Sequence, residues 1–206
     1  MNITIIGHGS VGGALAKKWA EAGHQVVIGA RRPDDDKVLE LIREHDGLSV
    51  VDLPQSAREA DVVLFATPAT AVPDAARQLG ELSHAIVIDA TNGVRQKPEP
   101  YRNGLEAIKD ICKTSHVAKC FNTTGYENME NPSYGDTTAD MFVGGDSTRA
   151  KEVATQLAKD AGFKDIYDFG GDDKVDLMEE FAKAWINLAI MQGYGRDIAF
   201  KLIKRN

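Results

Sequence analysis

Six residues near the start of the chain have the types and spacing to bind a pyrophosphate: Gly7, His8, Gly9, Ser10, Val11 and Gly12. They form a G-x-G-x-x-G pattern between a short apolar run and an amphipathic stretch, the strand–turn–helix context of a dinucleotide-binding motif. The first glycine permits the tight turn, the second lets pyrophosphate approach bare backbone, and the third lets helix and strand pack closely. Because a helix N-terminus offers unpaired N–H groups to phosphates, the pattern predicts dinucleotide binding by all six residues.

Two arginines, Arg31 and Arg32, follow the second predicted strand. An NAD enzyme usually has a carboxylate there for the ribose 2′-OH, whereas arginine suits the 2′-phosphate of NADP. The alternative is a solvated basic turn with no ligand. Residues 34–36 are all aspartates and would repel a phosphate if they faced it. We expect them to serve the N-terminus of the next helix instead, where negative charge is favoured, and we interpret the arginines as favouring NADP over NAD.

Three later predicted strands end in polar or turn residues. In open α/β sheets, ligands bind in the crevice outside the carboxyl ends of the strands. The alternative is that these residues only form turns, in which Thr, Asn and Pro are common. We expect contacts to the cofactor from Ala66, Thr67 and Pro68 after one strand and from Thr91 and Asn92 after the next, and a substrate pocket near Asn122 and Thr123 after the third.

No side chain in the sequence stands out as a catalytic acid, base or nucleophile, and the catalytic residue is left unassigned. We find no Ser-His-Asp arrangement or metal-ligand cluster, and we expect Cys112 and Cys120 to be reduced thiols. Lys119 and Asn122 share the K-x-x-N spacing of one class of hydroxyacid dehydrogenases. In those enzymes the pair lies on a helix, but here it follows a strand, so we interpret the spacing as chance. His8 either faces the adenosine phosphate or projects into solvent.

An alternation of strands and helices must position these residues, and the hydrophobic pattern predicts one. Strands are expected over residues 2–6, 26–28, 48–51, 61–66, 85–90, 117–121, 140–143 and 165–169. Helices are expected over residues 11–22, 35–45, 148–161, 174–191 and 198–203. Strands that are apolar on both faces need helices on both sides of a parallel sheet. We therefore predict an α/β fold of the Rossmann type, doubly wound around a mainly parallel sheet, with a cofactor-binding domain over residues 1–170 and a small C-terminal helical part over residues 171–206.

Composition and charge exclude several function classes. The formal net charge of −7 argues against a nucleic-acid-binding protein, which needs a basic face. No apolar run reaches the roughly 20 residues of a membrane span, so we expect no membrane partner. The N-terminal residues enter a strand directly and lack the pattern of a secretory signal, which favours a cytoplasmic protein.

The chain resembles the NADPH-dependent F420 oxidoreductases and their bacterial relatives, the predicted dinucleotide-binding enzymes. The resemblance rests on residues 5–12, 26–32, 119–124, 139–146 and 193–202, and the last stretch is the most specific to the bacterial branch. It implies a Rossmann domain whose C-terminal helices help to form the substrate pocket and a homodimer. It also implies direct hydride transfer between NADPH and a flavin-like acceptor such as F420, FMN or FAD, a reaction that needs positioning more than acid–base chemistry.

Three departures from the family pattern leave fewer side chains to bind the 2′-phosphate. The family often has Ser or Thr in place of Ala30 and Thr in place of His8, and a helpful lysine falls within the aspartate run. The first hypothesis is therefore an NADP(H)-dependent reductase that acts on a flavin-like or small organic acceptor. The alternative is a non-catalytic NADP(H)-binding redox sensor that acts through a protein partner. An NAD-linked hydroxyacid dehydrogenase would need a general acid–base in the cleft, and we identify none.

Overall fold

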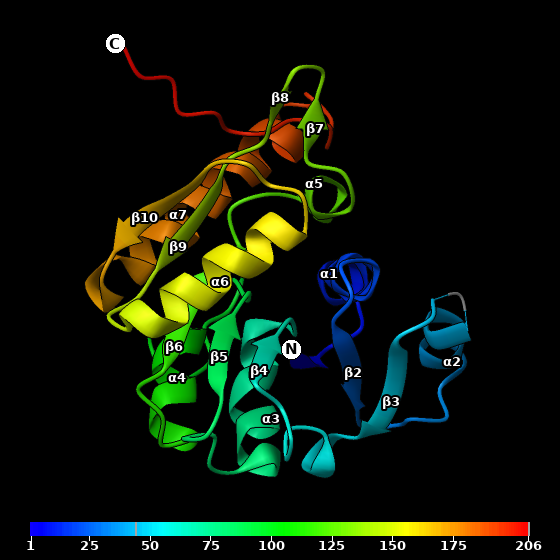
Figure 1. The fold of residues 1–206 in the computed structure, drawn as a ribbon. Helices are drawn as coiled ribbons and strands as arrows, with labels where there is room; N and C mark the ends of the chain where they lie inside the picture. Colours follow the sequence, from blue (N-terminus) through cyan, green and yellow to red (C-terminus); the bar gives the residue numbers. More distant parts are fainter. Residues whose placement is uncertain (44, 206) are drawn as a thin grey trace.

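An eight-stranded sheet forms the centre of the molecule in the computed structural model, which describes residues 1–43 and 45–205 (Figure 1). The strand order is β10-β9-β6-β5-β4-β1-β2-β3, and β1 to β6 run parallel to one another. The pairing of β9 with β6 is antiparallel. The strands are β1 (Asn2–Ile6), β2 (Gln25–Ala30), β3 (Leu48–Asp52), β4 (Val62–Phe65), β5 (Ile86–Asp89), β6 (Val117–Cys120), β9 (Met141–Gly144) and β10 (Ile166–Gly170).

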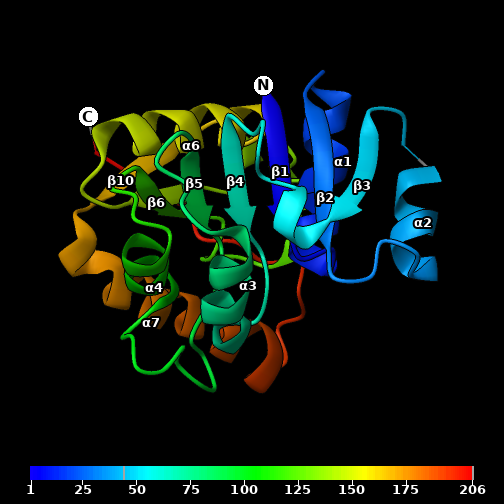
Figure 2. The ribbon, with the colours of Figure 1, turned by 90° about the horizontal axis from the view of Figure 1, so that it is seen from below.

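Helices cover both faces of this sheet, and two hydrophobic cores result (Figures 1 and 2). One core joins Leu64 and Ile88 to Leu15 and Leu157, and the other joins Val63 and neighbouring side chains to the helices of the opposite face. Successive strand residues point to opposite faces, so a strand buried on both sides must be apolar throughout. The helices are α1 (Ser10–Glu21), α2 (Asp36–Arg43), α3 (Val72–Leu79), α4 (Gly104–Ile111), α5 (Tyr126–Glu130), α6 (Thr148–Asp160) and α7 (Val175–Ile186).

The topology confirms the doubly wound, mainly parallel Rossmann fold. Strand order reverses between β1 and β4, and at this switch point an open α/β sheet forms its ligand crevice. The eight predicted strands and the first four predicted helices are all present within a few residues of their expected ends; of the expected 35–45 helix, residue 44 lies outside the described residues. Helices α3, α4 and α5 and the hairpin of β7 (Ser133–Tyr134) with β8 (Thr137–Thr138) were not predicted. The domain division at residue 170 stays a prediction.

The predicted helix over residues 198–203 is wrong, because tertiary partners take the backbone groups that a helix would use. The carbonyl oxygen of Phe200 accepts a hydrogen bond from the Asp140 N–H, and the Leu202 N–H donates to the Asp140 carboxylate at 2.6 Å. The carbonyl of Ile198 accepts from both Asn128 and Trp185. The segment is therefore an irregular strap that lies across the ends of other elements.

The expected apolar stripe of α7 is only partly buried. Met178, Trp185 and Ala189 are in the interior, whereas Leu177 and Leu188 are exposed. The helix continues from Asn187 to Met191 as a π-helical turn, in agreement with its predicted end. Among the residues that the structure describes, no helix is long and apolar enough to cross a membrane.

Candidate functional site

A Cβ atom would have a different effect at each of the three glycines where β1 leads into α1. Gly7 has φ +105°, and a Cβ there would lie 2.6 Å from the Ala66 carbonyl oxygen. A Cβ on Gly12 would lie 1.8 Å from the Gly7 carbonyl oxygen, so α1 packs against the loop only because Gly12 has no side chain. A Cβ on Gly9 would meet nothing within 4 Å. The loop thus has tight backbone at its ends and bare, open backbone in the middle, which fits a pyrophosphate.

Helix α1 presents its N-terminus to this open space. Gly9 is the N-cap, no side chain caps the first turn, and the first turn contains no acidic residue. The first N–H groups of a helix lack partners within the helix and attract anions when left free. The N-cap Gly9 borders a cavity of about 290 Å³, which we call the glycine-loop cavity, whereas Ser10 and Val11 in the first turn border a different cavity. The lining of the glycine-loop cavity includes seven predicted cofactor-binding residues: Gly7, His8, Gly9, Arg31, Ala66, Thr67 and Pro68.

The two arginines after β2 differ in their surroundings. Arg31 lines the glycine-loop cavity, but Arg32 does not and pairs with Asp35 at 3.2 Å. The same aspartate accepts a hydrogen bond from the Lys37 N–H at the start of α2. As expected for the aspartate run, this carboxylate serves a helix N-terminus. Only Arg31 is placed to reach a phosphate in the cavity without moving a partner.

A larger cavity of about 740 Å³ shares Pro68 with the first in its lining, and we call it the strand-end cavity. Ser10, Val11, Asn92 and Asn122 also line it. The two asparagines are interlocked: the Asn92 amide donates to the Asn122 carbonyl oxygen at 2.8 Å, and the Asn122 amide donates to Asn92 Oδ1 at 3.0 Å. The structure therefore brings the ends of β5 and β6 together with the start of α1.

Four buried side-chain oxygens in the described part of the chain lack a hydrogen-bond partner: Thr67 Oγ1, Thr91 Oγ1, Asn122 Oδ1 and Thr123 Oγ1. Buried polar atoms are normally paired, so such a group next to a cavity can accept or donate a bond to a ligand. Thr67 and Asn122 line the two cavities. Neither cavity is lined by Thr91, Thr123, Gly12 or Arg32. The side chains of Thr91 and Thr123 are buried.

Sequence reasoning missed the far wall of the strand-end cavity. Tyr126 from α5, Trp185 from α7 and Arg196 from the C-terminal strap line it. The Arg196 guanidinium lies 5.4 Å from the ring centres of both aromatic residues, and it is also paired with Glu127. The resemblance carried by the 193–202 stretch implied that the C-terminal part helps to form the substrate pocket, but it named no lining residue, because only the fold returns this strap to the strand ends.

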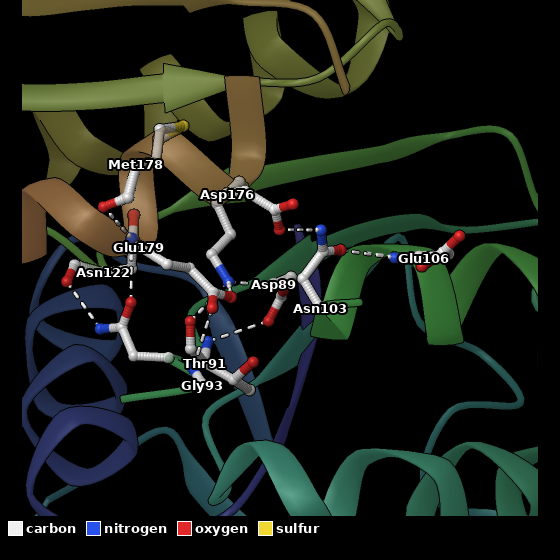
Figure 3. A network of polar contacts seen from close by, with 11 residues as sticks. Asp89, Thr91, Gly93, Asn103, Glu106, Asn122, Asp176, Met178 and Glu179 are labelled. Atoms are coloured by element: carbon white, nitrogen blue, oxygen red, sulfur yellow. Dashed lines mark hydrogen bonds and ion pairs between the residues drawn. The ribbon is translucent and has the colours of Figure 1, made fainter. Parts of the chain in front are cut away.

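A buried ion cluster joins β5, β6 and α7 outside the lining of the strand-end cavity (Figure 3). Lys119 on β6 donates to Asp89 on β5 at 2.9 Å and to Glu179 on α7 at 2.8 Å. Burial alone would lower the pKa of Lys119, but the charges of Asp89 and Glu179 outweigh it and hold the pKa above its usual value. The sequence did contain a signal for two of the three members of the cluster, since Asp89 and Lys119 are charged residues inside otherwise apolar strands. They are direct neighbours in the register of β5 and β6.

The other titratable candidates offer no reactive group. Burial raises the pKa of the Cys112 thiol to about 11 and that of Cys120 further, so both stay protonated at neutral pH. In the described residues, no group of three or more His, Cys, Asp or Glu side chains is arranged to hold a metal ion. The strand-end cavity therefore offers amides, hydroxyls, aromatic rings and arginines, and the glycine-loop cavity adds open backbone, His8 and Asp74.

Comparison with known proteins agrees with this geometry. Residues 2–93 match the family model "NADP oxidoreductase coenzyme F420-dependent". The F420-dependent NADP reductase of Methanothermobacter thermautotrophicus is 29% identical, with 92% of this chain and 90% of that protein aligned. The crystal structure of a candidate F420-dependent NADP reductase from Arthrobacter sp. FB24 superimposes with a TM-score of 0.82 at 25% identity, covering 98% of this chain and 99% of that one. The chain is similar to F420-dependent NADP reductases along almost its whole length.

The similarity extends more weakly to larger dehydrogenases. A glycerol-3-phosphate dehydrogenase [NAD(P)+] from Leuconostoc citreum is 22% identical over 99% of this chain. The chain spans 65% of the length of that enzyme. The family and these relatives are oxidoreductases linked to NAD(P), and they differ in the molecule at the other end of the hydride transfer.

Proposed function

We propose that this chain is an NADP(H)-dependent oxidoreductase that transfers a hydride between NADPH and a flavin-like acceptor such as F420, FMN or FAD, or a small organic acceptor. One observation carries the proposal. The glycine-loop cavity and the strand-end cavity share Pro68 in their linings, so a dinucleotide that enters at the loop would extend toward a second, larger cavity. Hydride transfer requires two ligands to meet in this way, whereas simple dinucleotide storage does not.

The loop and the arginines favour NADPH as the donor. The uncapped start of α1 and the open backbone at Gly9 fit the pyrophosphate, and Arg31 lines the same cavity. The end of β2 has Ala30 and two arginines where an NAD enzyme would have a carboxylate. NADPH, when bound, supplies the hydride, and the residues of this chain orient it and exclude water.

The lining of the strand-end cavity favours a planar, anionic acceptor. It contains Tyr126, Trp185, Arg95 and Arg196 but no carboxylate, although the chain as a whole carries a net charge of −7. A flat aromatic ring system can stack on such side chains, and guanidinium groups pair with phosphate or carboxylate groups. FMN and F420-type acceptors combine both properties.

The same lining disfavours a hydroxyacid dehydrogenase, which must move a proton to or from a hydroxyl group. It contains no histidine, lysine or carboxylate among the described residues, and Tyr126 is the one side chain of the usual acid–base types that lines it. Lys119 is not available for that role, because it is fully buried and its three N–H groups are used by Asp89, Thr91 and Glu179.

Calorimetric titration with NADPH and with NADH tests the cofactor assignment. We expect NADPH to bind more tightly, and Arg31→Ala to remove about 1.5–3 kcal/mol of that preference, the usual contribution of a hydrogen bond to a charged group. Arg32→Ala is the matched control and should cost less, because Arg32 is paired with Asp35 and lies outside the cavity. Equal binding of both cofactors, unchanged in either variant, would contradict the assignment.

Turnover then tests the enzyme against the redox-sensor alternative. FMN and riboflavin form a matched pair, because they differ only in the phosphate. We expect NADPH oxidation to be faster with FMN at low concentration and this advantage to shrink at high salt, which screens exposed charges. A protein that binds NADPH but leaves it unoxidised with F420, FMN, FAD and ferric chelates would instead be a sensor.

A further inference from the structure

Helix α7 forms one wall of the strand-end cavity through Ala182, Trp185 and Ile186. One turn earlier, Met178 and Glu179 meet the ends of β5 and β6. Residues three or four apart lie on one face of a helix, so the contacts of Met178 and Glu179 directly set where the lining residues lie. Whatever fixes this turn also fixes the width of the cavity.

Two hydrogen bonds join this turn to the cavity floor (Figure 3). The Gly93 N–H donates to Glu179 Oε2 at 3.0 Å, and the Asn122 amide donates to the Met178 carbonyl oxygen at 3.2 Å. Lys119 also connects α7 to the end of β5. Its ammonium group donates to Glu179 Oε1 at 2.8 Å and to the Thr91 carbonyl oxygen at 2.5 Å.

The charges of this cluster are withdrawn from water. The Lys119 and Asp89 side chains are fully buried, and that of Glu179 is 5% exposed. Separating such a cluster leaves an unpaired buried charge, so it resists small displacements far more than a surface ion pair does. Apolar residues would attach a helix equally well, because buried ion pairs seldom add stability over a well-packed core. The cluster therefore fixes the position of α7 relative to the ends of β5 and β6 and adds little to stability.

We infer that Glu179 and Lys119 are positioning residues that hold α7 at a set distance from the ends of β5 and β6. They thereby set the width of the gap in which the acceptor lies against the cofactor. This inference rests on the proposed function only for the identity of the occupant. Neither side chain touches the occupant, and both act through Gly93, Thr91 and the α7 wall.

The test replaces Glu179, because removal of Lys119 would leave two buried carboxylates together and endanger folding. Glu179→Leu leaves a neutral pair of Lys119 with Asp89. Glu179→Gln keeps the length of the side chain and one acceptor oxygen, so it can accept from the lysine or from the Gly93 N–H but not from both, and it restores the contacts only in part. Asp176→Ala is the matched control. It lies in the first turn of the same helix and accepts a hydrogen bond from Asn103, and neither residue lines the strand-end cavity (Figure 3).

The first readout needs no substrate. The chain has two tryptophans, of which Trp19 is fully buried and Trp185 lines the cavity, so acrylamide quenching of fluorescence follows the α7 wall. We expect quenching to increase severalfold in Glu179→Leu, to return toward wild type in Glu179→Gln and to stay unchanged in Asp176→Ala. Equal quenching in wild type and Glu179→Leu would overturn the inference, and so would the same increase in Asp176→Ala.

The second readout separates positioning from loss of structure. We expect the KM for FMN to rise about tenfold or more in Glu179→Leu, since small misplacements of reacting groups have effects of this size, while the Kd for NADPH stays within about twofold. A parallel loss of NADPH affinity would indicate general disruption and overturn the inference. If the wild-type protein reduces no acceptor, the proposed function fails, and quenching alone decides the role of Glu179.

Discussion

Substitutions at two glycines of the loop should have different effects, one on stability and the other on ligand binding. A Cβ on Gly12 would collide with the Gly7 carbonyl oxygen. A Cβ on Gly9 would have free space, and the Gly9 backbone, with φ −70°, has a conformation that any residue can adopt. We predict that Gly12→Ala lowers the free energy of unfolding by about 1–3 kcal/mol, as overpacking does. Gly9→Ala should keep or slightly raise stability but weaken NADPH binding, because its methyl group points where the pyrophosphate would lie. Urea denaturation and calorimetry measure both effects; unchanged NADPH affinity in Gly9→Ala would contradict the placement of the pyrophosphate.

Among the elements, the C-terminal strap depends on one buried carboxylate. The Asp140 side chain is fully buried and accepts bonds from Lys201 and from the Leu202 N–H, each at 2.6 Å. We predict that Asp140→Ala lowers the free energy of unfolding by about 1.5–3 kcal/mol and speeds tryptic cleavage at Lys201. Asp165→Ala is the control: Asp165 also pairs with Lys201 but is half exposed, so its loss should cost less than about 1 kcal/mol. Equal effects of the two substitutions would show that the strap is not held through Asp140.

For the whole molecule, exposed apolar side chains are concentrated near the C-terminus. In residues 1–43 and 45–205, the large hydrophobic side chains that are exposed comprise Met1 and seven residues between 177 and 203: Leu177, Leu188, Ile190, Met191, Tyr194, Leu202 and Ile203. Contiguous exposed apolar surface commonly marks an interface. We predict a homodimer by light scattering and dissociation by Met191→Lys, which lies outside both cavities. Gln55→Lys, an exposed site near β3, should leave the dimer intact. A wild-type monomer at all concentrations would refute the prediction.

The sequence by itself determined the features that depend on neighbouring residues. Strand β4 and helix α1 were predictable because side-chain periodicity reports burial on one or both faces. The loop from Gly7 to Gly12 was predictable because its chemistry lies within six consecutive residues. The end of β6 was predictable as a site, since the carboxyl ends of parallel strands share one edge.

Only the tertiary structure decided the features that join distant segments. Glu179 lies 60 residues from Lys119, and Arg196 lies 69 residues from Glu127, so no local pattern could pair them. The strap over residues 198–203 has a helical pattern, but Asp140, Asn128 and Trp185 compete for its backbone groups and prevent the helix. Likewise, Arg31 and Arg32 are equivalent in the sequence. Only the structure shows that Arg31 lines the glycine-loop cavity, whereas Arg32 lies outside it and pairs with Asp35. Local propensity specifies elements, whereas the competition for buried hydrogen-bond partners is resolved only when those elements meet.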